Sequence, residues 1–319
     1  MKDKIMAVSM RISKSNMREV LSMETLETKP LKGKVAVVAG STRGAGRAIA
    51  VMLGAAGATV YCTGRSVRGQ KSDINRPETI EDTADMVTER GGVGIPVKCD
   101  HTVEAQVKAL FERVSEEQNG QLDILVNDVW GGEHLTHWNV PFWEQFLSDG
   151  LLMQERAVTS HLMTSYYGVP LMVQQGSGLV IEITDGSTYR YRGNLYYSLA
   201  KISGIHLAEA MAAELSPYNV TALSVTPGFL RSEQMLAHFG VGEDNWQDAV
   251  AKDPHFIESE TPYLIGQAVA ALAADPKVSE KSGRALTSWD LSDEYGFSDI
   301  DGRKPHWGNY AKKHGLPLP

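Results

Sequence analysis

Short apolar runs alternate with amphipathic segments along most of the chain. The runs VAVVAG, ATVYC, LDILVN and GLVIEIT are rich in β-branched and aliphatic residues, which is typical of strands buried on both faces of a parallel sheet. Between such runs, segments such as VEAQVKALFERV repeat apolar residues every three to four positions, as helices with one buried face do. This alternation predicts an α/β fold: a doubly wound parallel sheet with helices on both faces and right-handed crossovers.

The same pattern predicts how the chain is divided. Residues 1–30 carry charges throughout, and we expect them to form a flexible N-terminal extension to one domain that covers 31–319. Residues 230–260 interrupt the alternation after the sixth apolar run. Because ligands of such sheets bind outside the carboxyl ends of the strands, this insertion is expected to be a substrate lid. A C-terminal tail begins at about residue 297.

Composition and charge exclude several classes of function. The net charge of -8 argues against a nucleic-acid partner, which needs a basic face. No apolar run reaches the roughly 20 residues that a membrane span requires. Only two cysteines, Cys62 and Cys99, are present, which indicates a reducing cytoplasm rather than a disulfide framework. His134 and His137 lack a third neighbouring ligand, so no metal site is expected.

Three glycines lie between the first apolar run and the helical segment that follows it. In AGSTRGAGRAIA, Gly40 allows a tight turn, Gly44 lets the backbone approach a pyrophosphate, and Gly46 lets the helix pack closely on the strand. The first turn of such a helix offers free N–H groups and partial positive charge. We therefore expect this turn, with Ser41 and Ala45, to bind the phosphates of a dinucleotide. A P-loop is excluded, because no Gly-Lys-Ser/Thr follows.

The spacing Gly-x-x-x-Gly-x-Gly resembles that of the short-chain dehydrogenase/reductase family. The resemblance extends from about Leu31 to Gly296 and includes YSLAK, which matches the Tyr-x-x-x-Lys of that family, and TPG after the sixth strand. It implies a Rossmann-type three-layer fold of about seven strands and an NAD(P)-dependent oxidoreductase. The segment HLMTSYYGVPLM and the loop after the fifth strand look most like the dehydrogenase/reductase member 1 branch.

The resemblance also implies further cofactor contacts. Asp100 ends the third strand, where the family holds the adenine ring, and Asn127 ends the fourth, although the family's NNAG is here NDVW. Pro227 and Gly228 match the Pro-Gly motif that follows the sixth strand. In relatives, the two helices beside the fifth strand commonly form the subunit interface, so the resemblance implies a homodimer or homotetramer.

Tyr197 and Lys201 are four residues apart on an expected helix and therefore share one face. A free tyrosine has a pKa of about 10, and a nearby ammonium lowers it. Tyr197 could then donate a proton to a carbonyl oxygen as hydride arrives, or remove it in the reverse reaction. The resemblance implies that Lys201 also holds the nicotinamide ribose.

The sequence departs from the family pattern at two further positions. The family's serine after the fifth strand is replaced by ITD; Thr184 lies thirteen residues before Tyr197, and a loop one residue shorter would put Asp185 at the serine position. Because an ionised aspartate cannot donate a hydrogen bond, Thr184 or Ser187 is the better candidate, and we favour Thr184. Asp185 could instead bind a basic or hydroxyl group of the substrate, or be protonated. The asparagine of the family's long helix falls on Ala157.

Arginines near the expected adenosine ribose indicate which cofactor is bound. The second strand ends without an acid at Thr63 or Gly64, where NAD-binding proteins place one, and Arg65 follows. Arg43 lies inside the glycine turn. Guanidinium groups bind phosphate well, so the sequence favours NADP(H) over NAD(H).

These features together predict an NADP(H)-dependent oxidoreductase. It would transfer hydride between nicotinamide and a carbonyl or alcohol carbon of a small molecule, with Tyr197 as general acid and base. The departures at the serine and asparagine positions leave open a second class of function, a cofactor-binding regulatory or scaffold protein that has lost turnover. Tyr197 and Lys201 argue against that alternative.

Overall fold

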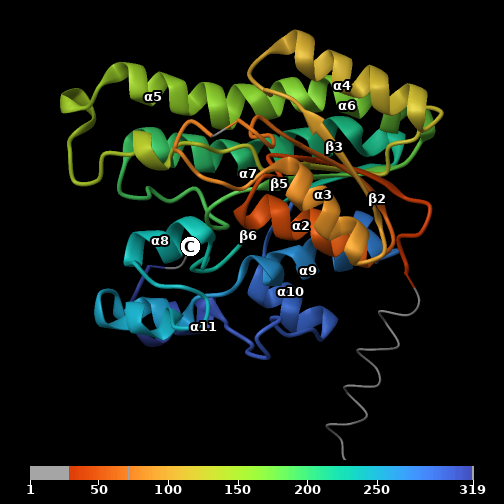
Figure 1. Ribbon diagram of the computed structural model, residues 1–319. Coiled ribbons are helices and arrows are strands. Elements are labelled where there is room, and N and C mark those ends of the chain that lie inside the picture. Colours follow the sequence, from red (N-terminus) through yellow and green to blue (C-terminus); the bar gives the residue numbers. More distant parts are fainter. Residues whose placement is uncertain (1–28, 71, 318–319) are drawn as a thin grey trace, which may run out of the picture.

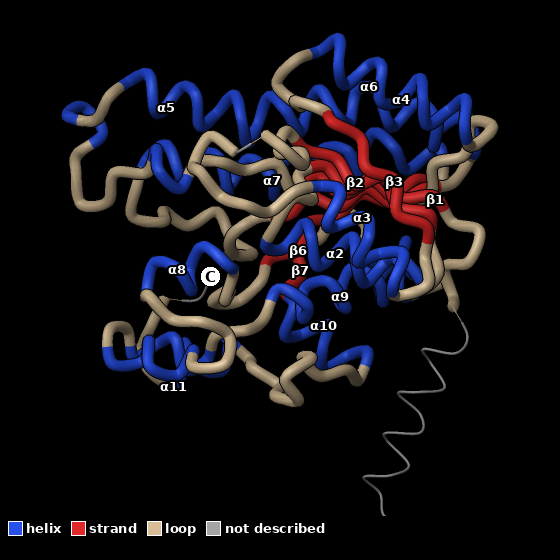
Figure 2. Tube along the Cα trace, in the orientation of Figure 1, coloured by secondary structure: helices blue, strands red, loops and turns tan. Residues whose placement is uncertain are grey.

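A single parallel sheet forms the centre of the computed structural model, which describes residues 29–70 and 72–317. The expected N-terminal extension therefore lies almost entirely outside the described residues. In the described part of the chain the sheet has seven strands in the order β3-β2-β1-β4-β5-β6-β7, between two layers of helices (Figure 2). The strands are β1 (Val35–Ala39), β2 (Thr59–Gly64), β3 (Val93–Lys98), β4 (Ile124–Asn127), β5 (Gly178–Ile183), β6 (Val220–Thr226) and β7 (Ala285–Thr287).

Alternate side chains of the central strands enter two separate hydrophobic cores, because successive side chains of a strand point to opposite faces. Val38 and Ile181 belong to one core, and Val37 and Val180 to the other. Figure 1 shows the two helix layers on either side of the sheet. The first core is covered by α2 (Gly44–Ala55), α3 (Ile80–Glu89), α9 (Pro262–Ala274) and α10 (Ser288–Tyr295), and the second by α4 (Glu104–Glu117), α6 (Ser160–Gln175) and α7 (Leu195–Leu215).

The connection from β4 to α6 is long and only partly α-helical. After the short 3-10 turns η1 (Glu133–Leu135) and η2 (Phe142–Glu144), helix α5 (Leu147–Gln154) runs into a π-helical turn, η3 (Glu155–Thr159), before α6 begins. Single π turns inside helices are often found at functional sites. This one brings the residues of η3 to the carboxyl end of the sheet.

The segment between β6 and α9, which the sequence predicts to be a lid and which is called the lid below, has a small core of its own. It contains α8 (Glu233–Phe239), η5 (Trp246–Ala251) and η6 (Pro254–Glu258). The side chains of Phe239, Trp246 and Phe256 are buried against one another at its centre. The remaining 3-10 turns, η4 (Ser216–Tyr218) and η7 (Val278–Lys281), lie beside β6.

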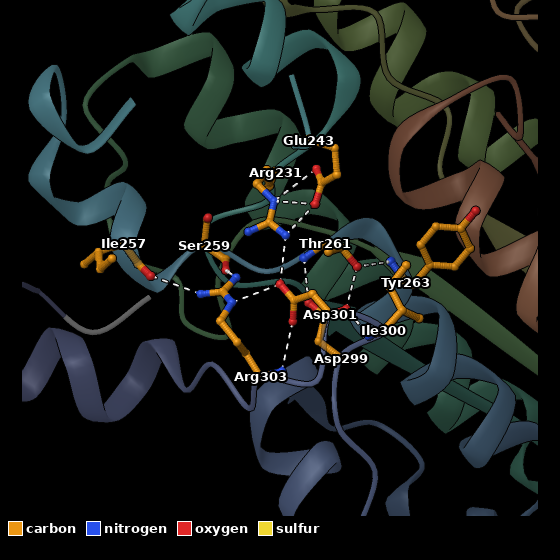
Figure 3. Close-up of polar contacts among 10 residues, drawn as sticks. All are labelled: Arg231, Glu243, Ile257, Ser259, Thr261, Tyr263, Asp299, Ile300, Asp301 and Arg303. Carbon is orange, nitrogen blue, oxygen red and sulfur yellow. Dashed lines mark hydrogen bonds and ion pairs between the residues drawn. The ribbon is translucent and has the colours of Figure 1, made fainter. Parts of the chain in front are cut away.

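The C-terminal tail, which includes α11 (Trp307–Lys313), contacts the lid through charged and aromatic side chains. Figure 3 shows the buried Arg231 guanidinium between two carboxylates: Glu243 of the lid at 2.6 Å and Asp301 of the tail at 2.9 Å. The same guanidinium lies 4.3 Å from the ring centre of Trp246, and the guanidinium of Arg303 lies 4.4 Å from that ring centre. Charge and cation–π contacts therefore join the tail to the lid.

Candidate active site

The glycine turn between β1 and α2 is packed too closely for any side chain at two of its positions. A Cβ at Gly40, which has φ +89°, would lie 2.5 Å from the carbonyl oxygen of Asp128, and one at Gly46 would lie 2.4 Å from that of Gly40. The turn thus holds the start of α2 against the ends of β1 and β4. At Gly44 the space is open, and its N–H donates to Oε2 of Glu233 on the lid helix α8 at 2.9 Å.

A cavity of about 230 Å³ opens at this end of the sheet. A second cavity of about 300 Å³ shares Arg43, Arg65 and Asp100 with it. The first cavity runs from the glycine turn to α7, so a single ligand can contact both. Of the residues expected at the site, it is lined by Gly40, Arg43, Gly44, Ala45, Arg65, Asp100, Thr184, Lys201 and Pro227.

Five residues expected at the cofactor site line neither cavity, and one of them is Tyr197. Ser41 is buried and its N–H donates to the carbonyl of Thr63. Gly46 packs on the turn, and the N–H of Gly228 donates to a buried glutamate, Glu260, at 2.9 Å. Asn127 is the last residue of β4 and points into the core, because strand alternation leaves the next position, Asp128, to face the cavity.

Tyr197 and Lys201 lie on one face of α7, as their spacing predicts. The side chain of Asn194 caps this helix by accepting the N–H of Tyr197 at 3.1 Å, which fixes where the helix begins. The Lys201 ammonium lies 4.0 Å from the ring centre of Trp130 and 5.8 Å from that of Tyr197. The ring of Tyr197 also contacts Trp138, with centroids 5.1 Å apart.

Asp185, rather than Thr184, meets the Tyr197 phenol. The phenolic O–H donates to Oδ2 of Asp185 at 2.7 Å. The hydroxyl of Thr184 turns the other way and donates to the backbone carbonyl of Lys201 at 2.5 Å. Ser187 lies two residues beyond Asp185 and is half-buried. Asp185 is therefore in hydrogen-bond contact with Tyr197, whereas the hydroxyl of Thr184 is directed to the backbone of α7.

This arrangement changes the expected ionisation of the pair. Burial and the adjacent Asp185 carboxylate raise the pKa of Tyr197 well above its ordinary 10. The expectation that a nearby Lys201 gives Tyr197 a lowered pKa is therefore wrong: the net shift is upward, and the charge that opposes it is that of Arg192. Burial lowers the pKa of Lys201, although Asp185 and Asp128 oppose that shift.

Beneath the site, Glu182 of β5 is wholly buried and fully partnered. It accepts the amide of Asn127 at 2.7 Å and lies 2.6 Å from Nδ1 of His161 on α6. The other nitrogen of His161 faces the carbonyl of Val129 at 3.0 Å. Carboxylate and carbonyl oxygens both accept hydrogen bonds, so these contacts suit an imidazole that is protonated on both nitrogens. Burial lowers the pKa of His161, but the charge and hydrogen bond of Glu182, with smaller effects of Val129 and Asp128, together outweigh it, so the net shift is upward.

Four charged residues of the first cavity were not among the site residues expected from the sequence, and one of them, Glu133, lines both cavities. Arg156 of η3 lines both cavities, Asp128 lines the first beside Lys201, and Glu233 reaches it from the lid. Burial raises the pKa of Asp128 to about 7. Of the other three, only Asp128 had a sequence signal, its place beside the asparagine that ends β4. Arg156 and Glu233 reach the cavity through the π turn and the fold of the lid, which no local pattern indicates.

Residues 29–70 and 72–317 contain neither a metal-binding cluster nor a membrane-spanning helix. No cluster of three or more His, Cys, Asp or Glu side chains there could hold a metal ion. No helix in that part of the chain is long and apolar enough to cross a membrane. Cys62 and Cys99 are buried free thiols, and burial raises the pKa of each to about 12.

Known proteins share this fold and much of the sequence. The family model for short chain dehydrogenase matches residues 34–239. The chain is 38% identical over 278 residues to dehydrogenase/reductase SDR family member 1 of Mus musculus, covering 86% of this chain and 85% of the relative, and equally identical to that of Homo sapiens. The expected likeness to that branch is confirmed.

Solved structures show the same architecture. A short chain dehydrogenase from Mycobacterium thermoresistibile superposes with a TM-score of 0.72 at 22% identity, covering 87% of this chain and 92% of that one. A putative NAD(P) dependent gluconate 5-dehydrogenase from Beutenbergia cavernae, solved with bound NADP at low occupancy, has a TM-score of 0.63 at 23% identity, covering 81% and 96%. At these identities the likeness establishes the Rossmann-type fold alone.

Proposed function

The chain belongs to the short-chain dehydrogenase/reductase family and is an oxidoreductase, and from that premise we propose that it uses NADP(H) to interconvert a carbonyl and an alcohol. The observation that carries the proposal is that Lys201, which shares a face of α7 with Tyr197, lines the same cavity as the glycine turn. A dinucleotide that begins at the turn can therefore end beside these two side chains.

The residues of the cavity fit such a cofactor. The Gly44 N–H lies at the start of α2, where helix geometry favours an anion, and it already donates to a carboxylate oxygen of Glu233. Arg43 and Arg65 supply guanidinium groups for phosphate, and Asp100 lies between the two cavities at the position that the family uses for adenine. Lys201 would hold the nicotinamide ribose. When bound, the nicotinamide supplies or accepts the hydride.

Tyr197 would handle the proton. The phenol is protonated at neutral pH, as donation to a carbonyl oxygen requires, but its raised pKa makes it a weaker acid while Asp185 accepts its O–H. The substrate oxygen must take the place of Asp185 as the acceptor of the Tyr197 O–H. Trp130 and Trp138 flank the phenol, so the substrate is expected to be a small molecule with apolar groups beside its carbonyl or alcohol.

A second candidate is a cofactor-binding regulatory or scaffold protein without turnover. The observation that favours it is the Asp185 carboxylate, which stands where the family uses a hydroxyl donor and would oppose negative charge on the substrate oxygen. Ala157 also favours this candidate, because it replaces the asparagine of the family's long helix.

One experiment separates the two candidates. Purified wild type, Tyr197→Phe and the control Tyr196→Phe are titrated with NADPH and NADH and then assayed with a panel of aldehydes and ketones. Turnover that is lost only in Tyr197→Phe, with NADPH affinity kept, supports the oxidoreductase with Tyr197 as its acid. Tight NADPH binding in all three without turnover favours the regulatory protein. Binding of neither cofactor contradicts both.

We also propose that the protein assembles as a homodimer or homotetramer. Large apolar side chains are exposed on neighbouring helices: Leu151 of α5, Leu162 and Tyr166 of α6, and Leu199 of α7, all at least half exposed. Several large exposed apolar side chains on one layer of helices favour an interaction site there. Light scattering after size exclusion should report a mass of two or four chains, and Tyr166→Asp should reduce it.

The free thiols support a cytoplasmic location. Cys62 lies on β2 and Cys99 just after β3, both buried and unpaired with each other. Unbridged cysteines are typical of proteins from reducing compartments. A fluorescent fusion in the native cell should show diffuse cytoplasmic signal, and a membrane-bound or secreted fusion would contradict the proposal.

A further inference from the structure

Two arginines from distant parts of the chain converge on one carboxylate oxygen. Oδ2 of Asp73 lies 3.0 Å from Nη2 of Arg65 and 3.1 Å from Nη2 of Arg156. Arg65 follows β2, whereas Arg156 belongs to the π turn η3. All three residues line the second cavity, together with Asp100. The structure therefore contains an anion position between two guanidinium groups, filled by the protein's own aspartate.

Arg156 is held in place before any ligand arrives. Its Nη1 donates to the carbonyl of Gly131 at 2.9 Å, and its side chain is only 12% exposed. Asp73, by contrast, is 51% exposed on the loop between β2 and α3. An arginine fixed in this way loses little conformational entropy when it binds an anion, and an exposed carboxylate can be exchanged at modest cost.

The charges around the cavity favour a phosphate over a carboxylate. Arg43, Arg65, Lys98 and Arg156 line it on the basic side, and Asp73, Asp100 and Glu133 on the acidic side. With Asp73 displaced, four basic groups face two acidic ones. A phosphate monoester carries about -1.5 to -2 charges and three acceptor oxygens, so it can bind two guanidinium groups at once where a carboxylate brings a single charge.

We propose that Arg156 is a further specificity residue for the cofactor. With Arg65 it forms a clamp for the 2′-phosphate of NADP(H), and Asp73 occupies the clamp until the phosphate displaces it. This inference rests on the proposed use of NADP(H). It adds Arg156, from η3, as a third arginine beside Arg65 and Arg43. It also identifies Asp73 as an internal competitor for the position of the phosphate.

The test uses two small probes that differ only in the 2′-phosphate, adenosine 2′,5′-bisphosphate and AMP. Their dissociation constants are measured by calorimetry for the full chain and four variants, one of which is Arg156→Lys. Arg156→Met removes the charge and keeps the length of the side chain. Asp73→Asn removes the competitor. Arg113→Met, an exposed arginine of α4 outside both cavities, is the matched control.

We expect wild type and Arg113→Met to prefer the bisphosphate. Arg156→Met should lose at least about tenfold of affinity for the bisphosphate and little for AMP, because a charge-assisted hydrogen bond contributes this much. Asp73→Asn should bind the bisphosphate several-fold more tightly and leave AMP unchanged. Arg156→Lys keeps the charge, so its affinity for the bisphosphate should lie between those of wild type and Arg156→Met. Its thermal melting temperature shows whether the fold is kept.

The contradicting outcomes are distinct. If Arg156→Met weakens both probes equally, Arg156 contacts another part of the nucleotide and the clamp is wrong. If Asp73→Asn binds the bisphosphate no better than wild type, Asp73 is not a competitor. If wild type itself does not distinguish the probes, the proposed preference for NADP(H) fails, and the clamp fails with it. A wild type that prefers the bisphosphate, with a preference that Arg156→Met retains, overturns the clamp alone.

Discussion

Replacing Asp185 by asparagine should lower the pKa of Tyr197 and leave its burial unchanged. In the structure the phenolic oxygen and Oδ2 of Asp185 are 2.7 Å apart, and the carboxylate raises the pKa both by its charge and by accepting the hydrogen bond. Asparagine has nearly the same shape, so only the charge is lost. A neighbouring charge of this kind shifts a pKa by roughly 1 to 3 units. Each unit corresponds to about 1.4 kcal/mol between the two protonation states.

The ionisation of Tyr197 can be followed without knowing the substrate. Phenolate absorbs in the near ultraviolet, and subtracting the same protein with Tyr197→Phe removes the signal of the other tyrosines. In wild type, Tyr197 should not ionise near pH 10. In Asp185→Asn, the pH at which Tyr197 ionises should be lower and closer to 10. Asp244→Asn, which alters an exposed aspartate of the lid, is the control and should titrate as wild type does.

Activity should follow the same shift. Oxidation of an alcohol needs the phenolate as a base, so its rate should begin to rise at a lower pH in Asp185→Asn than in wild type. Superimposable titrations of wild type and Asp185→Asn would refute the reasoning, since the Asp185 charge would then have no effect on Tyr197. A shift of the same size in Asp244→Asn would refute it too, because the effect would not be local.

Three further outcomes are expected from the buried carboxylates and the lid. Glu182→Gln should lose about 3–5 kcal/mol of unfolding free energy in urea, because it leaves the charged His161 buried without its partner. Glu233→Gln should bind NADPH several-fold more tightly in a fluorescence titration, because the neutral amide competes less well for the Gly44 N–H. Burial raises the pKa of Glu260 from 4.5 to about 8, so the folded state holds a proton that the unfolded state has lost. Stability should therefore fall by about 1.4 kcal/mol per pH unit between these values, and Glu260→Gln should flatten the slope in thermal melts.

The order of strands and helices could be predicted because it depends on local patterns. Runs of β-branched residues marked β1, β4 and β5, and each is buried on both faces. Even β3 could be recognised, although it is a partly exposed edge strand that contains Pro96, a residue that edges tolerate. The π turn η3 could not, because a single wider turn leaves no periodic signal in the sequence.

The candidate site could be predicted only where it depends on helical spacing. Tyr197 and Lys201 are four residues apart within α7, so their shared face follows from the sequence. Whether Thr184 or Asp185 faces them depends on the length of a loop by one residue, which spacing leaves open. Arg156 lies on η3, where the extra residue of a π turn shifts every side chain around the helix axis, so helical periodicity assigns it to the wrong face.

Three acidic side chains make the contacts that the proposed function assigns to ligands. Glu233 accepts the Gly44 N–H, Asp73 joins two arginines, and Asp185 accepts the Tyr197 O–H. A hydrogen-bond donor that is partly buried costs about 1–3 kcal/mol when unsatisfied. By accepting from these donors, the three carboxylates stabilise the side-chain arrangement of the structure. The same contacts must be broken for pyrophosphate, 2′-phosphate and substrate oxygen to bind. It follows that neutralising any one carboxylate should favour only the ligand group that replaces it, and this selectivity distinguishes local competition from a general change in net charge.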